Sequence, residues 1–204
     1  MIKGKTEEVT ALKLAVERLR KYFPLSDENA EKLLGYCEMR YFDKKVVMVE
    51  MGETDQYLNL IYKGMVRKFI KKGRSEVTLQ LSTEGHFVHS ENSFLKQVPS
   101  GVIIETLEPT TMISISYTNF QKLLNEIPES VRMARLLVTA MFVKKDARHY
   151  KELEQTTRER FLEYIQSHPH MLQRVPQKYL ASYLNIKPET FSRLKHLLKT
   201  GTKS

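Results

Sequence analysis

The chain has 204 residues, of which 41% are hydrophobic and 28% are charged. This is an ordinary globular composition, and it excludes a disordered or fibrous chain. Basic residues exceed acidic residues by nine, which points to a polyanionic partner, and the single cysteine excludes an intrachain disulfide or a multi-cysteine metal or iron–sulfur site.

The beginning of the chain, which reads MIKGKTEEVTALKL, has no apolar core of signal-peptide length. The densest apolar stretch, residues 133–143, is interrupted by Arg135 and is far shorter than the roughly 20 residues of a membrane span. We therefore expect a cytoplasmic protein with no membrane partner. No cofactor is evident from the sequence.

Residues from about 6 to 40 have the apolar periodicity of helices. Apolar residues recur at spacings of three and four between Val9 and Leu19. After a break at Pro24, Ser26 or Asp27 is suited to cap a second, short helix.

From about residue 41 to residue 116 the apolar pattern changes to a period of two, which is typical of strands. Residues 71–74 contain a glycine between basic residues and predict a hairpin turn. The expected strands are residues 47–51, 58–62, 66–70, 76–81, 102–107 and 112–116. About 75 residues of short strands separated by turns predict one small β-roll.

A long helix is predicted from Pro128, a residue suited to a first helical turn, to about Glu154. Nine of the eleven residues 133–143 are apolar and cover every face of this helix, so it must be buried on more than one side. The simplest cover is the same helix of a second subunit, which predicts a two-fold symmetric dimer; the alternative is a central helix of a monomer. The dimer contacts are predicted at Ala134, Leu137, Val138 and Met141.

The basic surplus lies mainly at the end of the chain. Residues 144–204 contain 13 Lys and Arg against 6 Asp and Glu, which favours contact with a nucleic acid, although a solvated basic face would have the same composition. Within this region Thr156 and Glu159 form the pattern of a capping box at the start of a helix.

Residues 175–198 have the pattern of two helices joined by a tight turn. Pro176 is suited to the first position of one helix and Pro188 to the first position of the next. Asn185, between them, tolerates the left-handed conformation that such a turn requires. Ala181 is small where two helices would cross, and Phe191 lies on the inward stripe of the second helix. This is a helix-turn-helix pattern.

Helical geometry places Glu189, Ser192, Arg193 and His196 on one outward face of the second helix. Arg193 is of the type that makes two hydrogen bonds to guanine, and Glu189 can accept one from cytosine. An ion pair between them, one turn apart, would fix the Arg193 side chain before binding. An amphipathic hairpin with an ordinary surface ion pair is the alternative. The predicted DNA-binding residues are Gln177, Lys178, Lys187, Pro188, Glu189, Ser192, Arg193 and His196.

With these elements the chain resembles the Crp/Fnr family of bacterial transcription regulators over nearly its whole length. The resemblance is closest at residues 175–198, where residues 189–193 match the family's recognition helix, and weaker matches lie at residues 62–66 and 85–87. The resemblance implies an α+β fold with a cyclic-nucleotide-binding-like β-roll, flanking helices, a long dimerisation helix and a C-terminal helix-turn-helix domain. It also implies a homodimer that binds a two-fold symmetric site on double-stranded DNA, RNA polymerase as a partner, and switching by a small-molecule effector.

The domain boundaries that follow are a β-roll sensor domain at residues 1–127, a dimerisation helix at 128–154 and a DNA-binding domain at 155–204. The family usually adds a β-hairpin wing after the recognition helix. Because few residues remain after that helix, we expect the wing to be absent or to be formed by residues such as Gln173, Arg174 and Val175.

The sequence departs from the cyclic-nucleotide-responsive members at two places. The resemblance implies a Gly-Glu pair for the ribose and an Arg-Ser pair for the phosphate, but His89 and Ser90 stand at the first place. Between Lys96 and Arg132 the only basic residue is Lys122, on a predicted helix, and a buried phosphate needs a charged partner. We expect an effector other than the usual cyclic nucleotide, with its binding residues unknown.

The competing hypothesis is a metal-dependent, cupin-like β-roll enzyme whose basic tail only dimerises, with His86 and His89 as metal ligands. The strands contain no further histidine, and we expect both to lie in solvent-exposed turns with no metal bound. Cys37 is expected to be a small buried residue of the second helix. The helix-turn-helix favours a regulator that is not an enzyme.

Overall fold

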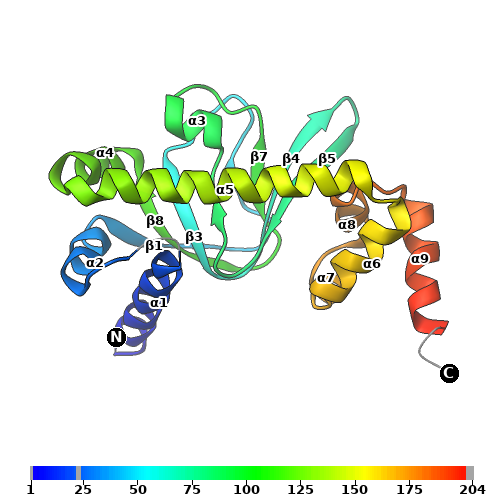
Figure 1. Cartoon of the computed structure of the whole chain (residues 1–204), viewed down its shortest axis with the longest axis horizontal. Helices are drawn as coiled ribbons and strands as arrows, with labels where there is room; N and C mark the ends of the chain where they lie inside the picture. The colour runs from blue at the N-terminus through cyan, green and yellow to red at the C-terminus, as the bar shows by residue number, and fades with distance from the viewer. Residues whose placement is uncertain (1, 22–23, 201–204) are drawn as a thin grey trace. The chain divides into compact units, whose positions relative to one another are not determined.

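The computed structural model describes residues 2–21 and 24–200, with side chains for residues 9–21 and 24–196. Its helices are α1 (Ile2–Arg20), α2 (Asp27–Leu34), α3 (Glu91–Lys96), α4 (Tyr117–Glu126), α5 (Pro128–Glu154), α6 (Thr157–Ser167), α7 (Met171–Arg174), α8 (Gln177–Tyr183) and α9 (Pro188–Thr200). Its strands are β1 (Cys37–Phe42), β2 (Val47–Val49), β3 (Tyr57–Lys63), β4 (Val66–Lys72), β5 (Ser75–Ser82), β6 (Phe87–Val88), β7 (Ile103–Thr106) and β8 (Thr110–Ser116) (Figure 1).

The chain divides into two compact units. Unit 1 contains Met1–Lys68 and Leu81–Met141, and unit 2 contains Phe69–Gln80 and Phe142–Ser204. The outer part of the β4–β5 hairpin therefore belongs to the unit that contains the C-terminal helices. The division also falls inside α5, whereas the sequence pattern placed boundaries at residues 127 and 154.

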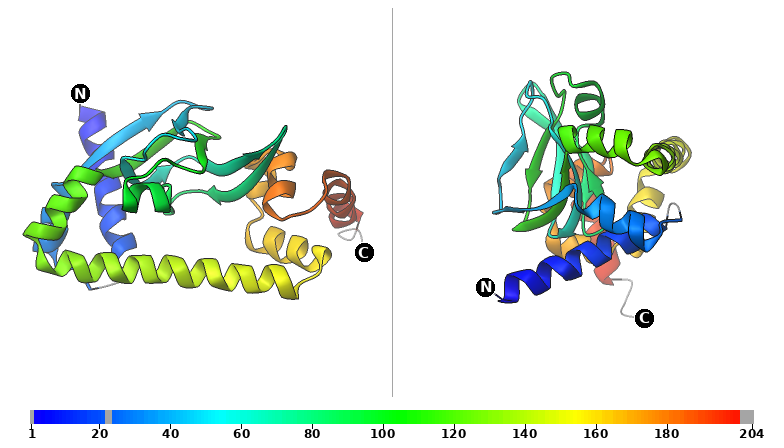
Figure 2. Two further views of the ribbon diagram at one scale, coloured as in Figure 1. Left: turned by 90° about the horizontal axis from the view of Figure 1, so that it is seen from above. Right: turned by 90° about the vertical axis from the view of Figure 1, so that its left-hand side faces the viewer.

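The strands form two four-stranded sheets, in the orders β1-β8-β3-β6 and β2-β7-β4-β5. Figure 2 shows them from two further directions. β1 and β3 pair antiparallel with β8 on either side of it. The predicted α+β fold with a β-roll is confirmed, as is the hairpin between β4 and β5, where Gly73 has a φ of 61°.

Side chains of the first sheet alternate between the interior of the roll and the helices outside it. In β3, Ile61 joins an apolar cluster inside the roll with Met112 of β8. The neighbouring residues Leu60 and Ile113 instead pack with Ala15 of α1. One face of this sheet therefore lines the roll, and the other forms a floor for α1 and α4.

The tight turn between β3 and β4 explains the glycine in residues 62–66. Gly64 has a φ of 105°, in the region that favours glycine. A Cβ atom at this position would lie 2.6 Å from the carbonyl oxygen of Pro109. The close approach of the two chain segments requires a residue without a side chain.

The second helix is shorter than its sequence pattern suggested. Ser26 is its N-cap and accepts a hydrogen bond from the amide of Asn29 at 3.2 Å. The helix ends at Leu34, and Cys37 begins β1, in register with Ile115 of β8. The assignment of Cys37 to this helix was wrong because pairing with a strand distant in the sequence overrides the local pattern.

Helix α5 extends over the 27 residues from Pro128 to Glu154, as predicted. Its apolar residues divide between two faces. Met133 and Leu137 are buried against their own chain, whereas Val138 and Phe142 are 49% and 67% exposed. Leu137 is therefore not available to a second subunit, which corrects one of the four predicted dimer contacts.

In unit 2, the predicted capping box opens α6: Thr156 and Glu159 each bind the other's backbone amide. Pro176 was expected at the first helical position of α8 but is its N-cap, so the helix begins one residue later, at Gln177. The carbonyl of Pro176 accepts a hydrogen bond from the amide of Leu180. Residues 171–174 are helical, so the suggestion that residues 173–175 form a wing was wrong. Between Tyr117 and Thr200, the described backbone contains no strand.

Polar contacts join the hairpin of unit 2 to its helices. The amide of Thr78 donates to Ser182 Oγ at 2.9 Å. Arg148 of α5 donates from Nη1 to the carbonyl of Leu79 at 3.1 Å and from Nη2 to that of Tyr183 at 3.0 Å. The Arg148 guanidinium also lies 3.9 Å from the centre of the Tyr183 ring. One side chain therefore ties β5 and the end of α8 to α5.

Candidate nucleic-acid interface

The turn between α8 and α9 has the geometry that the sequence predicted. Asn185 has a φ of 53°, in the left-handed region. Its amide donates to the carbonyl of Ser182 at 3.1 Å, and the amide of Ile186 donates to that of Ala181 at 2.9 Å. These two bonds form a Schellman motif, which ends α8 and turns the chain into α9.

The inward side of this motif is closely packed. Leu180, Ala181 and Phe191 are at most 1% exposed. The ring of Phe191 meets that of Phe161 in α6 edge to face, with centroids 5.1 Å apart. This packing fixes which side of α9 faces outward.

All the residues predicted to contact DNA are exposed in unit 2. They come from the start of α8, from the turn and from the outer side of α9. They are Gln177, Lys178, Lys187, Pro188, Glu189, Ser192, Arg193 and His196. The structure thus presents them on the surface of a helix-turn-helix, while their contact with DNA remains a prediction.

The expected ion pair between Glu189 and Arg193 is not formed in the described part of unit 2. The Lys178 ammonium lies 4.8 Å from the centre of the Tyr179 ring. Because Glu189 does not pair with it, Arg193 has no carboxylate partner in the described part of this unit. Its five donors are free of an intramolecular charge pair that a nucleic acid would have to displace.

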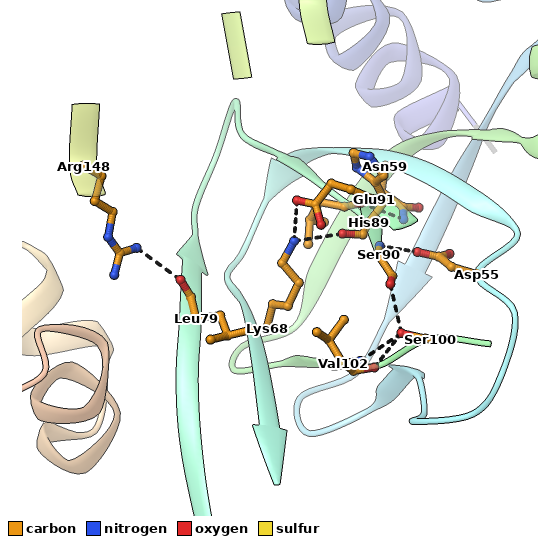
Figure 3. Close-up of polar contacts among 11 residues, drawn as sticks. Asp55, Asn59, Lys68, Leu79, His89, Ser90, Glu91, Ser100, Val102 and Arg148 are labelled. Atoms are coloured by element: carbon orange, nitrogen blue, oxygen red, sulfur yellow. Dashed lines mark hydrogen bonds and ion pairs between the residues drawn. The ribbon is translucent and has the colours of Figure 1, made fainter. Parts of the chain in front are cut away.

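The interior of the β-roll, in unit 1, contains buried charges that the sequence analysis missed (Figure 3). Lys68 of β4 has a side chain that is only 6% exposed. Its Nζ donates to Glu91 Oε1 at 2.6 Å and to the carbonyl of His89 at 3.0 Å. The neighbouring Arg67 is also fully buried, but on the opposite face of β4, because Val66 and Lys68 share the inner face. Its Nε lies 3.2 Å from Glu105 Oε1.

Hydroxyl and carboxylate groups complete this polar cluster. Ser100 Oγ donates to Ser90 Oγ at 2.9 Å, and the amide of Ser90 donates to Asp55 Oδ2 at 2.6 Å. Burial raises the pKa of Asp55, against the hydrogen bonds to its ionised form. From β1, the Arg40 guanidinium lies 3.8 Å from the centre of the Tyr57 ring. The interior therefore holds cations on β1 and β4, outside residues 96–132, where a phosphate partner was expected.

His89 is buried, which corrects the expectation of an exposed turn histidine. Its ring meets that of Phe94 at a centroid distance of 5.7 Å, and its Nδ1 has no hydrogen-bond partner in the described structure. Burial is the main cause that lowers the pKa of His89 to about 4, with Glu91 acting to raise it and Lys68 acting to lower it. The imidazole is therefore neutral at pH 7.

We expect acidification to weaken the protein through His89. Between pH 6.5 and 5 the unfolded chain takes up a proton at this histidine, whose ordinary pKa is about 6.5, while the folded chain does not. The free energy of unfolding should fall by about 1.5 kcal/mol over this range. Urea unfolding at several pH values measures the slope.

Two variants separate His89 from the other titrating groups. His89→Gln should flatten the slope, whereas His149→Gln, at an exposed position, should leave it unchanged. Glu91, with a lowered pKa, and Asp55, with a raised one, are present in the wild type and in both variants, so the comparison isolates His89. An unchanged slope in His89→Gln would contradict the assignment.

No group of three or more candidate metal-ligating side chains is found in the part of the chain whose side chains are described. His86, the other histidine of the suggested metal pair, is half-buried and binds Thr83 through Nδ1. Over the described range, no helix has both the length and the apolar composition needed to cross a bilayer.

Comparison with known proteins gives a weak sequence match and an extensive match in fold. No protein-family model matches the chain. It is 26% identical over 120 residues to the cAMP-activated global transcriptional regulator CRP of Escherichia coli O6:H1, and the match covers 56% of this chain and 57% of that protein. The chain thus spans little more than half the length of this curated relative.

Solved structures of regulators match most of the chain. FixK2 from Bradyrhizobium japonicum has a TM-score of 0.65 at 18% identity, covering 81% of this chain and 86% of that one. The c-di-GMP responsive global regulator CLP of Xanthomonas campestris has a TM-score of 0.64 at 16% identity, covering 87% and 93%. The Catabolite Activator Protein of Thermus thermophilus has a TM-score of 0.54 at 21% identity, covering 91% and 88%.

The chain has the fold of the Crp/Fnr regulators. The β-roll, the long helix and the helix-turn-helix follow one another in the order that the sequence resemblance implied. Within this Crp/Fnr fold, the ion pair between the buried Lys68 and Glu91 is the feature that sequence reasoning missed. A signal was present, since β4 places two consecutive basic residues, Arg67 and Lys68, among apolar ones.

Proposed function

We propose that the chain is a homodimeric, sequence-specific DNA-binding transcription regulator of the Crp/Fnr type. The observation that carries the proposal is the exposed face of α9, where Glu189, Ser192 and Arg193 project from a helix anchored by the buried Phe191. Arg193 and Glu189 are of the types that read guanine and cytosine in the major groove. Gln177 and Lys178 are suited to phosphate contacts, which set position and not sequence.

The exposed face of α5 supports the homodimer. Val131, Val138 and Phe142 are about half exposed or more, at spacings of seven and four residues along one side of the helix. A row of exposed apolar side chains is typical of an interaction surface. In a two-fold symmetric dimer, the same row of a second copy would pack against it. Two recognition helices related by a two-fold axis then bind two half-sites about one helical turn apart.

The effector in this proposal is not the usual cyclic nucleotide. Lys68, a cation inside the roll, is already paired with Glu91. Ser90 and Ser100 bind each other through their hydroxyl groups. A phosphate in this interior would have to displace Glu91 from Lys68, or break the hydrogen bond between the two serine hydroxyl groups. RNA polymerase remains the further partner that the resemblance implies.

Selection of duplexes from a random DNA pool, with purified protein at moderate salt and no added ligand, tests the proposal. A two-fold symmetric consensus is the expected result. Recovery of random sequence, with an affinity that falls steeply with salt, would be the behaviour of a merely basic tail and would contradict sequence-specific binding without an effector.

Arg193→Ala should weaken binding to the selected site by about 1–3 kcal/mol per contact, or roughly 5- to 150-fold, and leave binding to random DNA largely unchanged. The lost bonds are base contacts, whereas phosphate contacts carry the non-specific affinity. Titration of both duplexes at one salt concentration measures the difference.

Arg158→Ala is the matched control, because it removes the same charge from an exposed position on α6 outside the predicted reading face. It should weaken both duplexes alike, by the small amount that one lost positive charge contributes. If Arg193→Ala distinguished the two duplexes as well as the wild type does, the recognition assignment would be wrong.

A further inference from the structure

An apolar cavity of about 90 Å³ lies in unit 1, outside the β-roll. Helices α1, α2, α4 and α5 surround it, and strands β1, β3 and β8 form its floor. All of its lining residues belong to this unit. They include Leu19, Leu34, Cys37, Leu60, Ile113 and Leu137.

The alternation of side chains separates this cavity from the polar interior of the roll. Leu58 and Leu60 of β3 line the cavity, whereas Asn59, between them, accepts a hydrogen bond from Ser114 Oγ at 2.7 Å. In β8, Ile113 and Ile115 line the cavity on either side of Ser114. The inner face of the sheet therefore carries the polar Asn59 and Ser114 beside the apolar Ile61 and Met112, whereas its outer face lines an apolar pocket.

The cavity offers almost no hydrogen-bonding group. Ser130 Oγ is already bound to the carbonyl of Leu123 at 3.0 Å, and Cys37 Sγ lies 3.5 Å from the carbonyl of Leu33. A polar ligand placed here would lose its hydrogen bonds to water without replacement. An apolar ligand has no hydrogen bonds to water to lose. It would also give van der Waals contacts to side chains that now face empty space.

The size of the cavity limits the ligand. One water molecule needs about 10–15 Å³ of such space, so this cavity holds about six to nine water-sized groups. Cavities lined by Leu, Ile and Phe remain dry and bind small apolar molecules. We propose that this cavity is a binding site for an apolar molecule of about six to nine non-hydrogen atoms, either an alkyl chain or a single aromatic ring system.

A second copy of the chain is the competing occupant, and the geometry of α5 disfavours it. At about 100° per residue, Val138 lies within about 20° of Val131 around the helix axis. Met133 and Leu137, which line the cavity, lie about 200° and 240° from Val131. These two large side chains thus point away from the exposed row, and Ala134, about 60° from Val131, lies at the edge between the two sides.

Cys37 provides a probe for the cavity, since it lines the space and is the only cysteine of the chain. Burial raises the pKa of its thiol to about 12, so reaction with thiol reagents is slow and reports on access. The chain of 204 residues, without DNA, should react with N-ethylmaleimide at pH 9 at a measurable rate. Saturating 1-octanol or indole should slow this reaction at least 10-fold and raise the melting temperature in a concentration-dependent manner.

Two variants on α5 test whether the protection of Cys37 arises from binding in the cavity. Ala134→Leu fills part of the cavity and should abolish the protection, whereas the same change at the exposed Ala147 should leave it intact. Triethylene glycol, a polar molecule of similar size, should have no effect on the wild type.

The proposal is overturned if neither octanol nor indole changes the reaction rate or the melting temperature of the wild type. It is also overturned if Cys37 is protected without ligand and becomes reactive on dilution to the monomer, because a second copy then fills the space. If Ala134→Leu fails to fold, the titrations of the wild type with octanol and indole still test the proposal. Since no step uses DNA, failure of the proposed regulatory function would leave this result standing.

Discussion

Phe191→Ala is expected to lower the stability of unit 2 by about 3–5 kcal/mol, the range for truncation of a fully buried phenylalanine. The side chain is 0% exposed, and it packs edge to face on Phe161, which is also fully buried. Its loss leaves a cavity between α6 and α9 and removes the anchor of the proposed recognition helix. Hydrogen exchange of amides in these two helices measures the free energy of opening.

The same truncation at an exposed position provides the control. Phe142 is 67% exposed on α5, and Phe142→Ala should change the local stability of the monomer by less than about 0.5 kcal/mol. An effect of Phe142→Ala that appears only at high protein concentration would report association through α5. Equal losses in the two variants would contradict the packing described for Phe191.

Glu91→Gln is expected to lower the stability of unit 1 by about 3 kcal/mol, because it removes the carboxylate that the Nζ of the buried Lys68 pairs with. Lys68 is 6% exposed and Glu91 is 50% exposed, so the loss should lie at the low end of the range for buried pairs. Urea unfolding at pH 7 measures it. Adding Lys68→Met should recover most of the loss, since a well-packed apolar chain replaces the unpaired charge.

A surface pair of the same unit is the control for this variant. Lys32 Nζ lies 2.7 Å from Glu28 Oε1, with both side chains more than half exposed. Glu28→Gln should leave the unfolding midpoint unchanged because water solvates both groups. If Lys68→Met recovered nothing in the double variant, the ion pair would not be the source of the loss.

The parts of the fold that local chemistry determines were predictable from the sequence. Pro128 at a first helical turn, the Thr156–Glu159 capping box and the left-handed Asn185 each involve residues a few positions apart, and each is present in the structure. The outward face of α9 followed from the same short-range geometry, once Phe191 was recognised as the inward side.

The features that depend on distant residues were not predictable in the same manner. Lys68 meets Glu91 across 23 positions, and Cys37 pairs with a strand almost 80 residues away. The apolar pattern of α5 predicted that more than one of its sides is covered, but it did not reveal which side chains turn toward their own chain. Leu137 was assigned to the dimer for that reason.

The place of the β4–β5 hairpin affects how the C-terminal helices can be isolated. A recombinant fragment that begins at Phe142 would lack the Leu79 carbonyl that receives Arg148, and the Thr78 amide that binds Ser182. Such a fragment would expose polar groups that the whole chain satisfies internally. The contacts of the hairpin with Arg148 and Ser182 are therefore kept by expressing the entire polypeptide, or by grafting residues 69–80 onto the helices.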